Sequence, residues 1–198
     1  MKYIALLLTI FFYTSLLGQV KQLEKQKYIH SNEVIGWQME IPKNWDIITN
    51  EENREKHEQF LHYDEAWPKK KEKFPGFDDF QIGFKKDPLN QFQSVAKPFA
   101  YEKDGNWEEM NQASKESLFR SIEQAGIKID STATKLVKID DVEFHSYEFT
   151  VQSLRTYNLL IYRSLIKGYD LGIHINYDNE TLKQEMVDAW LNSTFKRD

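Results

Sequence analysis

Cysteine is absent from the 198-residue chain, and its absence removes several kinds of chemistry at once. Without a thiol there is no disulfide, no thiolate nucleophile and no cysteine-based metal site, so stability must come from packing. Glycine and proline are also sparse, at 8 and 5 residues, and the glycines are dispersed. The sequence contains no phosphate-binding glycine loop, no Gly-x-Ser-x-Gly elbow and no His-Glu-x-x-His zinc helix.

Long apolar runs are absent beyond the first eighteen residues. Met1 and Lys2 precede an apolar stretch over 3–17, which ends at Gly18 before a polar segment, the pattern of a secretory signal peptide. The stretch is shorter than the roughly 20 apolar residues that a membrane span needs. We therefore expect an exported, soluble protein, periplasmic or extracellular, and not a lipoprotein because no cysteine follows the leader. The expected division is a signal peptide at 1–18, a short polar arm at 19–27 and a single domain at 28–198.

An excess of positive charge is also missing, since the formal net charge is −5. This balance favours solubility and argues against a nucleic-acid partner, which requires clustered positive charge. Aromatic residues are abundant at 14%. We interpret most of them as the core of a β-rich domain, with an aromatic binding cleft as the alternative.

Alternating apolar and polar residues predict strands in the first half of the chain. The segment 37–41 is typical of a half-buried strand, 45–48 is expected to form its partner strand, and 80–84 predicts another strand. The remaining segments of this half are expected to lack strands: a short surface helix at 51–66, a loop at 67–79 and an irregular stretch at 87–98.

The second half predicts a helix, a strand meander and a final helix. Residues 106–125 carry apolar side chains at spacings of three and four, with Asn106 placed to cap the start and Gly126 to end the helix. A last helix is expected from Asn179 to about Thr194. The class is therefore α+β, an antiparallel β-sheet flanked by helices. Four strands joined in hairpins are predicted between the two helices, at 132–139, 142–151, 156–166 and 169–177.

The segment 36–45, Gly-Trp-Gln-Met-Glu-Ile-Pro-Lys-Asn-Trp, resembles the opening of the PsbP-like superfamily, in which a Gly-aromatic strand runs into a Pro-x-x-Trp turn. A hairpin like 156–177 followed by a last helix that closes near 193–195 fits the same layout, so the resemblance covers about residues 28–196. It implies an α/β/α sandwich. Members of the superfamily mostly dock to other proteins and share no catalytic residues, and function inferred from the fold is an analogy.

The histidines do not form a metal-ligand pattern. His57 and His62 lie five residues apart, about 140° around a helix, and do not share a face. His145 and His174 fall on strands separated by a third strand, about 10 Å apart and too far to share a zinc ion. Some photosystem relatives bind metals through histidine, but no matching motif occurs here. We expect no metal site and no cofactor.

One segment combines aromatic and basic residues, and we predict that it is a partner or ligand surface. Loops of mixed aromatic and charged residues often carry binding. The alternative is that the aromatic side chains pack on the domain while the lysines remain solvated. The residues of this predicted surface are Tyr63, Trp67, Lys69, Lys70, Lys71, Lys73, Phe74 and Phe77.

The sequence therefore predicts an exported, non-catalytic binding or assembly module whose partner is another protein of the cell envelope, with no nucleic acid and no membrane span in the mature chain. The alternative is a small-molecule or glycan-binding protein, possibly hydrolytic, with an aromatic cleft near residues 63–80. A stress-related envelope protein without a fixed ligand is not separable from the first hypothesis by sequence.

Overall fold

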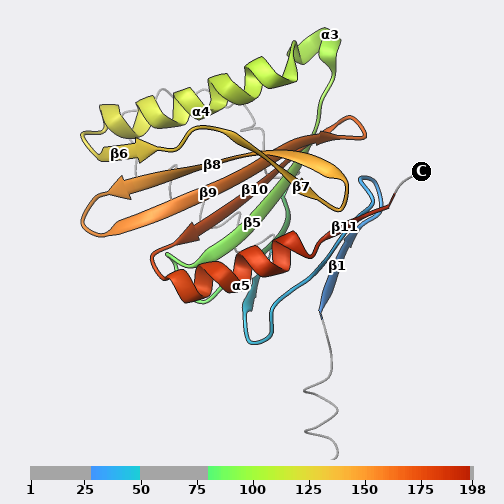
Figure 1. Ribbon diagram of the computed structural model, residues 1–198, viewed down its shortest axis with the longest axis horizontal. Helices are drawn as coiled ribbons and strands as arrows, with labels where there is room; N and C mark the ends of the chain where they lie inside the picture. The colour runs from blue at the N-terminus through green and yellow to red at the C-terminus, as the bar shows by residue number, and fades with distance from the viewer. Residues whose placement is uncertain (1–27, 50–79, 197–198) are drawn as a thin grey trace, which may run out of the picture.

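The computed structural model describes residues 28–49 and 80–196, which form two antiparallel sheets and three helices (Figure 1). The larger sheet has β7 (Lys135–Ile139) beside β8 at one edge. Along the rest of the sheet the strands follow the order β3 (Asp46–Ile48), β4 (Phe80–Lys85), β5 (Gln91–Pro98), β10 (Tyr169–Tyr177), β9 (Thr156–Ile166), β8 (Val142–Gln152) and β6 (Lys128–Ser131).

Two tight turns fix the register of the predicted meander. Asp140 and Asp141 join β7 to β8, and Lys167 and Gly168 join β9 to β10, all four with positive φ. Two consecutive residues with positive φ form the type of turn whose twist matches that of the flanking strands. The predicted hairpins are confirmed, because each strand pairs with its neighbour in the expected order.

Helices cover both faces of the larger sheet, which confirms the α+β class and the predicted sandwich. Helix α4 (Trp107–Gln124) packs through Leu118 and Ile122 on a cluster that includes Phe149. Helix α5 (Glu180–Leu191) covers the opposite face, where Trp190 lies at the centre of an aromatic core. Figure 1 shows these two helices on opposite sides of the strands, with the short helix α3 (Tyr101–Asp104) leading into α4.

The smaller sheet joins the first two described strands to the last one. Its strands are β1 (Ile29–Asn32), β2 (Trp37–Glu40) and β11 (Thr194–Phe195), with β2 in the middle. The Lys196 amide donates to the Gly36 carbonyl at 2.8 Å. Gly36 has φ of +74°, and a Cβ there would lie 2.9 Å from the Lys196 carbonyl oxygen, so this crossing requires glycine.

The predicted irregular stretch at 87–98 is wrong, because β5 occupies most of it and pairs with both β4 and β10. The inward side chains of β5 include the small or polar Ser94 and Ala96, which weakened the apolar signal. The polar Ser94 can be buried at low cost, because its hydroxyl accepts from the Ile82 amide at 3.1 Å and donates to the Ile82 carbonyl at 2.9 Å. These bonds lie beside the register shift in β4, so a polar residue stabilises the irregular strand.

Three further boundaries differ from the prediction. The strand at 46–48 pairs with β4 and not with the strand at 37–40. The predicted strand at 132–139 begins later, at Lys135, and is preceded by the separate β6; both lie along β8. Helix α5 ends at Leu191, and Thr194 belongs to β11. The leader, the helix at 51–66 and the loop at 67–79 lie outside the described residues. Within the described part of the chain, no helix combines the length and apolar character that crossing a bilayer requires.

Candidate functional site

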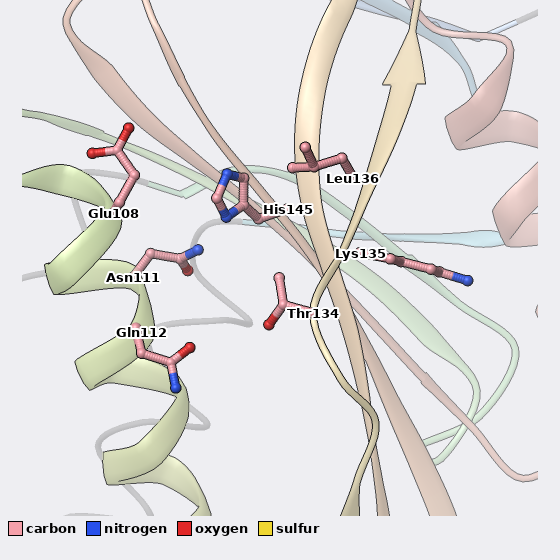
Figure 2. A pocket seen from close by; sticks show the side chains of 7 residues that line it. All are labelled: Glu108, Asn111, Gln112, Thr134, Lys135, Leu136 and His145. Carbon is pink, nitrogen blue, oxygen red and sulfur yellow. The ribbon is translucent and has the colours of Figure 1, made fainter.

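A pocket of about 350 Å³ lies between the first turns of α4 and the strands β7 and β8 (Figure 2). We call it the α4–β7 pocket. Asn111, Thr134 and His145 point into the gap between the helix and the strands, whereas Lys135 points away from it. Most of the lining side chains are exposed, so the pocket is open to solvent. Its lining residues are Glu108, Asn111, Gln112, Thr134, Lys135, Leu136 and His145.

The helical wall of the pocket is anchored at its first residues. The Asn106 side chain accepts a hydrogen bond from the Glu109 amide at 3.0 Å, which caps the helix as predicted. Trp107 is 4% exposed, and its indole Nε1 donates to the Asp170 carboxylate at 3.0 Å. The indole therefore fixes the start of α4, which forms one wall of the pocket, to strand β10.

A largely buried ion pair supports this anchor from the sheet side. Arg163 on β9 bonds to the carboxylate of Asp170, and both side chains are nearly buried, at 12% and 13% exposure. The same guanidinium lies 3.6 Å from the Met110 sulfur on α4. Burial, and then the charge of Arg163, lower the pKa of the nearby His174 to about 4. His174 is therefore neutral near pH 7. Among these three neighbouring side chains, only Arg163 and Asp170 are charged.

The floor and one end of the pocket are also fixed by side-chain contacts. The His145 ring packs edge-on against Trp107, with centroids 5.2 Å apart. Lys115 on α4 donates to the Thr132 carbonyl at 2.7 Å and to the Thr134 hydroxyl at 3.2 Å, and its ammonium lies 4.8 Å from the centre of the Tyr147 ring. Burial lowers the pKa of Lys115. Lys115 therefore ties the helix to the segment that connects β6 to β7.

Asn111 is the unusual member of the lining. It is 3% exposed, and its Oδ1 is buried without a hydrogen-bond partner among the described residues. Asn90 provides a direct comparison, because it is also 3% exposed. The Asn90 amide donates to Asp87 at 2.9 Å and to Asp178 at 2.7 Å, and its oxygen accepts from the Asp178 amide at 3.3 Å. Buried polar side chains are normally partnered in this way, so the unpartnered Oδ1 atom of Asn111 requires an explanation.

The chemistry available in the pocket is hydrogen bonding by neutral and charged groups. The lining offers two carboxamides, a hydroxyl, an imidazole and one carboxylate beside the exposed Leu136. Within residues 28–49 and 80–196, no three His, Asp or Glu side chains are grouped so that they could hold a metal ion.

A second hollow of about 430 Å³ lies between α5 and the turn after β2. Its rim carries the carboxylates of Glu40, Glu185 and Asp188. Glu185 accepts a 2.8 Å hydrogen bond from the Trp45 indole, which joins this turn to α5. None of the unpartnered buried polar atoms in the described part of the chain belongs to a residue that lines this hollow. It therefore lacks the feature that distinguishes the α4–β7 pocket.

The eight residues of the predicted surface, from Tyr63 to Phe77, all lie outside the described residues, so that surface stays a prediction. The α4–β7 pocket was not predicted from the sequence. One signal pointed toward it, because Asn111 follows Trp107 by four residues and so falls on the inward side of α4. A carboxamide at an inward helical position is uncommon. Thr134 and His145 carry no comparable signal.

No protein-family model matches the chain, and no curated protein sequence matches it. A solved structure does match: the solution structure of cyanobacterial PsbP (CyanoP) from Synechocystis sp. PCC 6803 has a TM-score of 0.54 against this chain. The match covers 86% of this chain and 92% of that chain at 9% sequence identity. Identity this low shows the fold alone, and the chain has a PsbP-like fold.

Proposed function

We propose that the protein is an exported, non-catalytic binding module that docks another protein outside the cytoplasm, and that the α4–β7 pocket belongs to its contact surface. The resemblance to proteins that mostly dock to other proteins supports the class of function. The α4–β7 pocket is the feature that supports our choice of the contact surface. The predicted basic and aromatic surface from Tyr63 to Phe77 is a separate prediction within the same class.

The observation that carries this proposal is the buried Oδ1 atom of Asn111, which has no hydrogen-bond partner among the described residues and belongs to the lining of an open pocket. A buried acceptor without a partner lowers stability, and an apolar side chain of similar size would avoid the loss. Such a group is stabilised once a ligand supplies a donor. A residue that weakens the free protein and strengthens a complex is typical of a binding site.

The support of the pocket favours binding without large rearrangement. The Trp107–Asp170 hydrogen bond, the Arg163–Asp170 pair and the Lys115 bonds fix both walls before a partner arrives. A site that is already ordered loses less conformational entropy on association, so more of the contact energy appears as affinity.

Site-specific photo-crosslinking tests the contact surface. A benzophenone amino acid at Gln112, exposed at the pocket, is compared with the same substitution at Gln184, exposed on α5 on the opposite face. Cells of the native host are irradiated, and adducts are identified by mass spectrometry. We expect a defined adduct from position 112 that is weak or absent from position 184.

The adduct must then be reproduced with purified proteins, and the Asn111→Leu variant should reduce it at least fivefold. Equal crosslinking from both positions, or an adduct unaffected by Asn111→Leu, would contradict the assignment of the pocket. Specific turnover that a point substitution abolishes would contradict the non-catalytic class.

Export has its own experiment, because residues 1–18 lie outside the described residues. The full chain is expressed in its host, the compartments are fractionated, and the N-terminus of the mature protein is sequenced. We expect a product that begins at Gln19 and is absent from the cytoplasmic fraction. An intact chain that begins at Met1 in the cytoplasm would refute this part of the proposal.

A further inference from the structure

The edge strand β7 has backbone groups that are not used within its sheet. The two-residue turn at Asp140 and Asp141 makes Ile139 and Val142 a hydrogen-bonded pair. In an antiparallel ladder every second pair along the strand is bonded, so the residues between them direct their backbone groups away from β8. These residues are Leu136 and Lys138. No strand in the described part of the chain pairs with this outer edge of β7.

The free edge and the pocket are continuous. Leu136 lines the pocket and is 57% exposed, and it stands opposite His145 of the floor in the β7–β8 register. Lys138 is on the same side of the sheet as Leu136, because side chains two residues apart in a strand share a face. A chain lying along β7 would therefore direct alternate side chains toward the pocket.

The register also changes at this place. Ser131 pairs with Phe149 and Lys135 pairs with Ser146, so the edge chain advances four residues while β8 advances three. The extra residue is a bulge in the segment 132–134, which contains Thr134 of the pocket lining. Bulges bend an edge strand. Here the bend carries β7 away from α4, and the pocket lies where the two separate.

We propose that β7 binds an extended peptide segment of a partner protein as an added strand, with a carboxamide side chain of that segment bonded to Asn111 in the α4–β7 pocket. This inference rests on the proposed function and names the chemistry of the partner. Backbone hydrogen bonds to Leu136 and Lys138 give affinity, and the pocket selects the side chain that enters it.

The preference for a carboxamide follows from the lining. In the free protein the Asn111 nitrogen points toward the gap and Oδ1 is buried (Figure 2). A small rotation of this amide on binding would offer both its donor and its acceptor, and the side chain of Gln or Asn has the complementary pair. A carboxylate has no donor for Oδ1 and would lie near Glu108 of the same lining. The Lys138 ammonium already pairs with Asp141 at 2.6 Å. The exposed Lys135 therefore favours an acidic residue within two positions of the carboxamide, because opposite charges across neighbouring strands attract.

The first experiment uses a phage-displayed library of random linear nonapeptides as the probe. The purified protein is selected in parallel with its Asn111→Leu variant, which keeps the helix but removes the amide. We expect peptides enriched on the parent that carry Gln or Asn with a nearby Asp or Glu, and at least tenfold weaker binding of the synthesised peptide to the variant. No enrichment over the variant, or enriched sequences without a carboxamide, would overturn the proposal.

The second experiment tests strand addition directly. Hydrogen exchange by NMR is measured on the parent protein with and without the enriched peptide. The amides of Leu136 and Lys138 should slow by at least tenfold in the complex, whereas that of Val137, already bonded to β8, should change little. Unchanged exchange at Leu136 and Lys138 would show that the peptide does not add to the edge.

Two variants at one position complete the test. Lys138→Pro removes an outward amide without removing a bond to β8, and edge strands tolerate proline there. Lys138→Ala keeps the outward amide and removes the charge together with its ion pair to Asp141. We expect a loss of affinity of tenfold or more for the proline variant and less than threefold for the alanine variant. Equal effects would refute strand addition. Failure here together with a specific crosslink from Gln112 would leave the proposed function standing, whereas failure of both would remove the pocket from the contact surface.

Discussion

Replacing Asn111 by Leu should stabilise the free protein, although most substitutions of buried residues destabilise. The Oδ1 atom is buried without a partner, and such a group lowers stability by about 1–3 kcal/mol. Leu has a similar size and a higher helix propensity than Asn, which adds a few tenths of a kcal/mol. The net gain should be about 2 kcal/mol. In a protein of this size that corresponds to a rise in Tm of roughly 4–8 °C.

Two control variants isolate the cause of this gain. Ser117→Leu lies on an exposed position of α4 and should gain only the propensity term. Asn90→Leu should lower the free energy of unfolding by about 2 kcal/mol, because Asn90 is equally buried but bonds to Asp87 and Asp178. Replacing these two equally buried asparagines by Leu is thus expected to change the free energy of unfolding in opposite directions.

Urea denaturation followed by tryptophan fluorescence gives the three free energies of unfolding. A loss of stability in Asn111→Leu, or a gain no larger than that of Ser117→Leu, would refute the reasoning. Either result would mean that the Asn111 amide is satisfied in the free protein, and the main argument for the α4–β7 pocket would fail.

Three further predictions concern Asp170 and His174 beneath the pocket and the crossing of Gly36 with Lys196. Asp170→Asn should lower the free energy of unfolding by about 3 kcal/mol in urea denaturation, because it leaves the Arg163 cation nearly buried without its counter-ion. The pKa of His174 is near 4 when folded and 6.5 when unfolded, so the unfolded chain binds more protons between these values. Stability should be complete above pH 6.5 and fall by about 2 kcal/mol toward pH 4.5, and His174→Gln should flatten this fall in denaturation curves at both pH values. Gly36→Ala should lower Tm by several degrees in calorimetry, since its Cβ would lie 2.9 Å from the Lys196 carbonyl oxygen at a positive φ. A melting curve like that of the parent would contradict the glycine requirement.

The elements that the sequence predicted well are those that local chemistry determines. In α4 these are the apolar side chains at spacings of three and four and the Asn106 cap, and in the meander they are the two-residue turns. Each of them acts within a few residues. Strands β1 and β11 could not be predicted, because each is short and exists only through pairing with β2. The pocket depends in the same way on long-range placement, since β9 and β10 supply Arg163 and Asp170 beneath a helix from another part of the chain.

The contrast between Ser94 and Asn111 shows why a polar residue at an inward position is ambiguous in a sequence. Both are buried, and both interrupt an apolar pattern. Ser94 bonds to both backbone groups of Ile82 and has a structural role. Asn111 has no such partner among the described residues and is a candidate for binding. Only the three-dimensional neighbours distinguish the two cases.

The pairing of β3 with β4 has a consequence for how the protein can vary. Ile48 stands opposite Gly83 in an antiparallel ladder, so the described strands that flank the segment 50–79 run side by side at the edge of the sheet. Strands arranged in this way can be joined by a very short turn. The sheet can therefore accept segments of very different length and composition at this position, and two proteins with the same framework can carry different sequences there. The pairing of these two strands therefore does not depend on the sequence of the segment 50–79, which contains the interleaved lysines and aromatic residues.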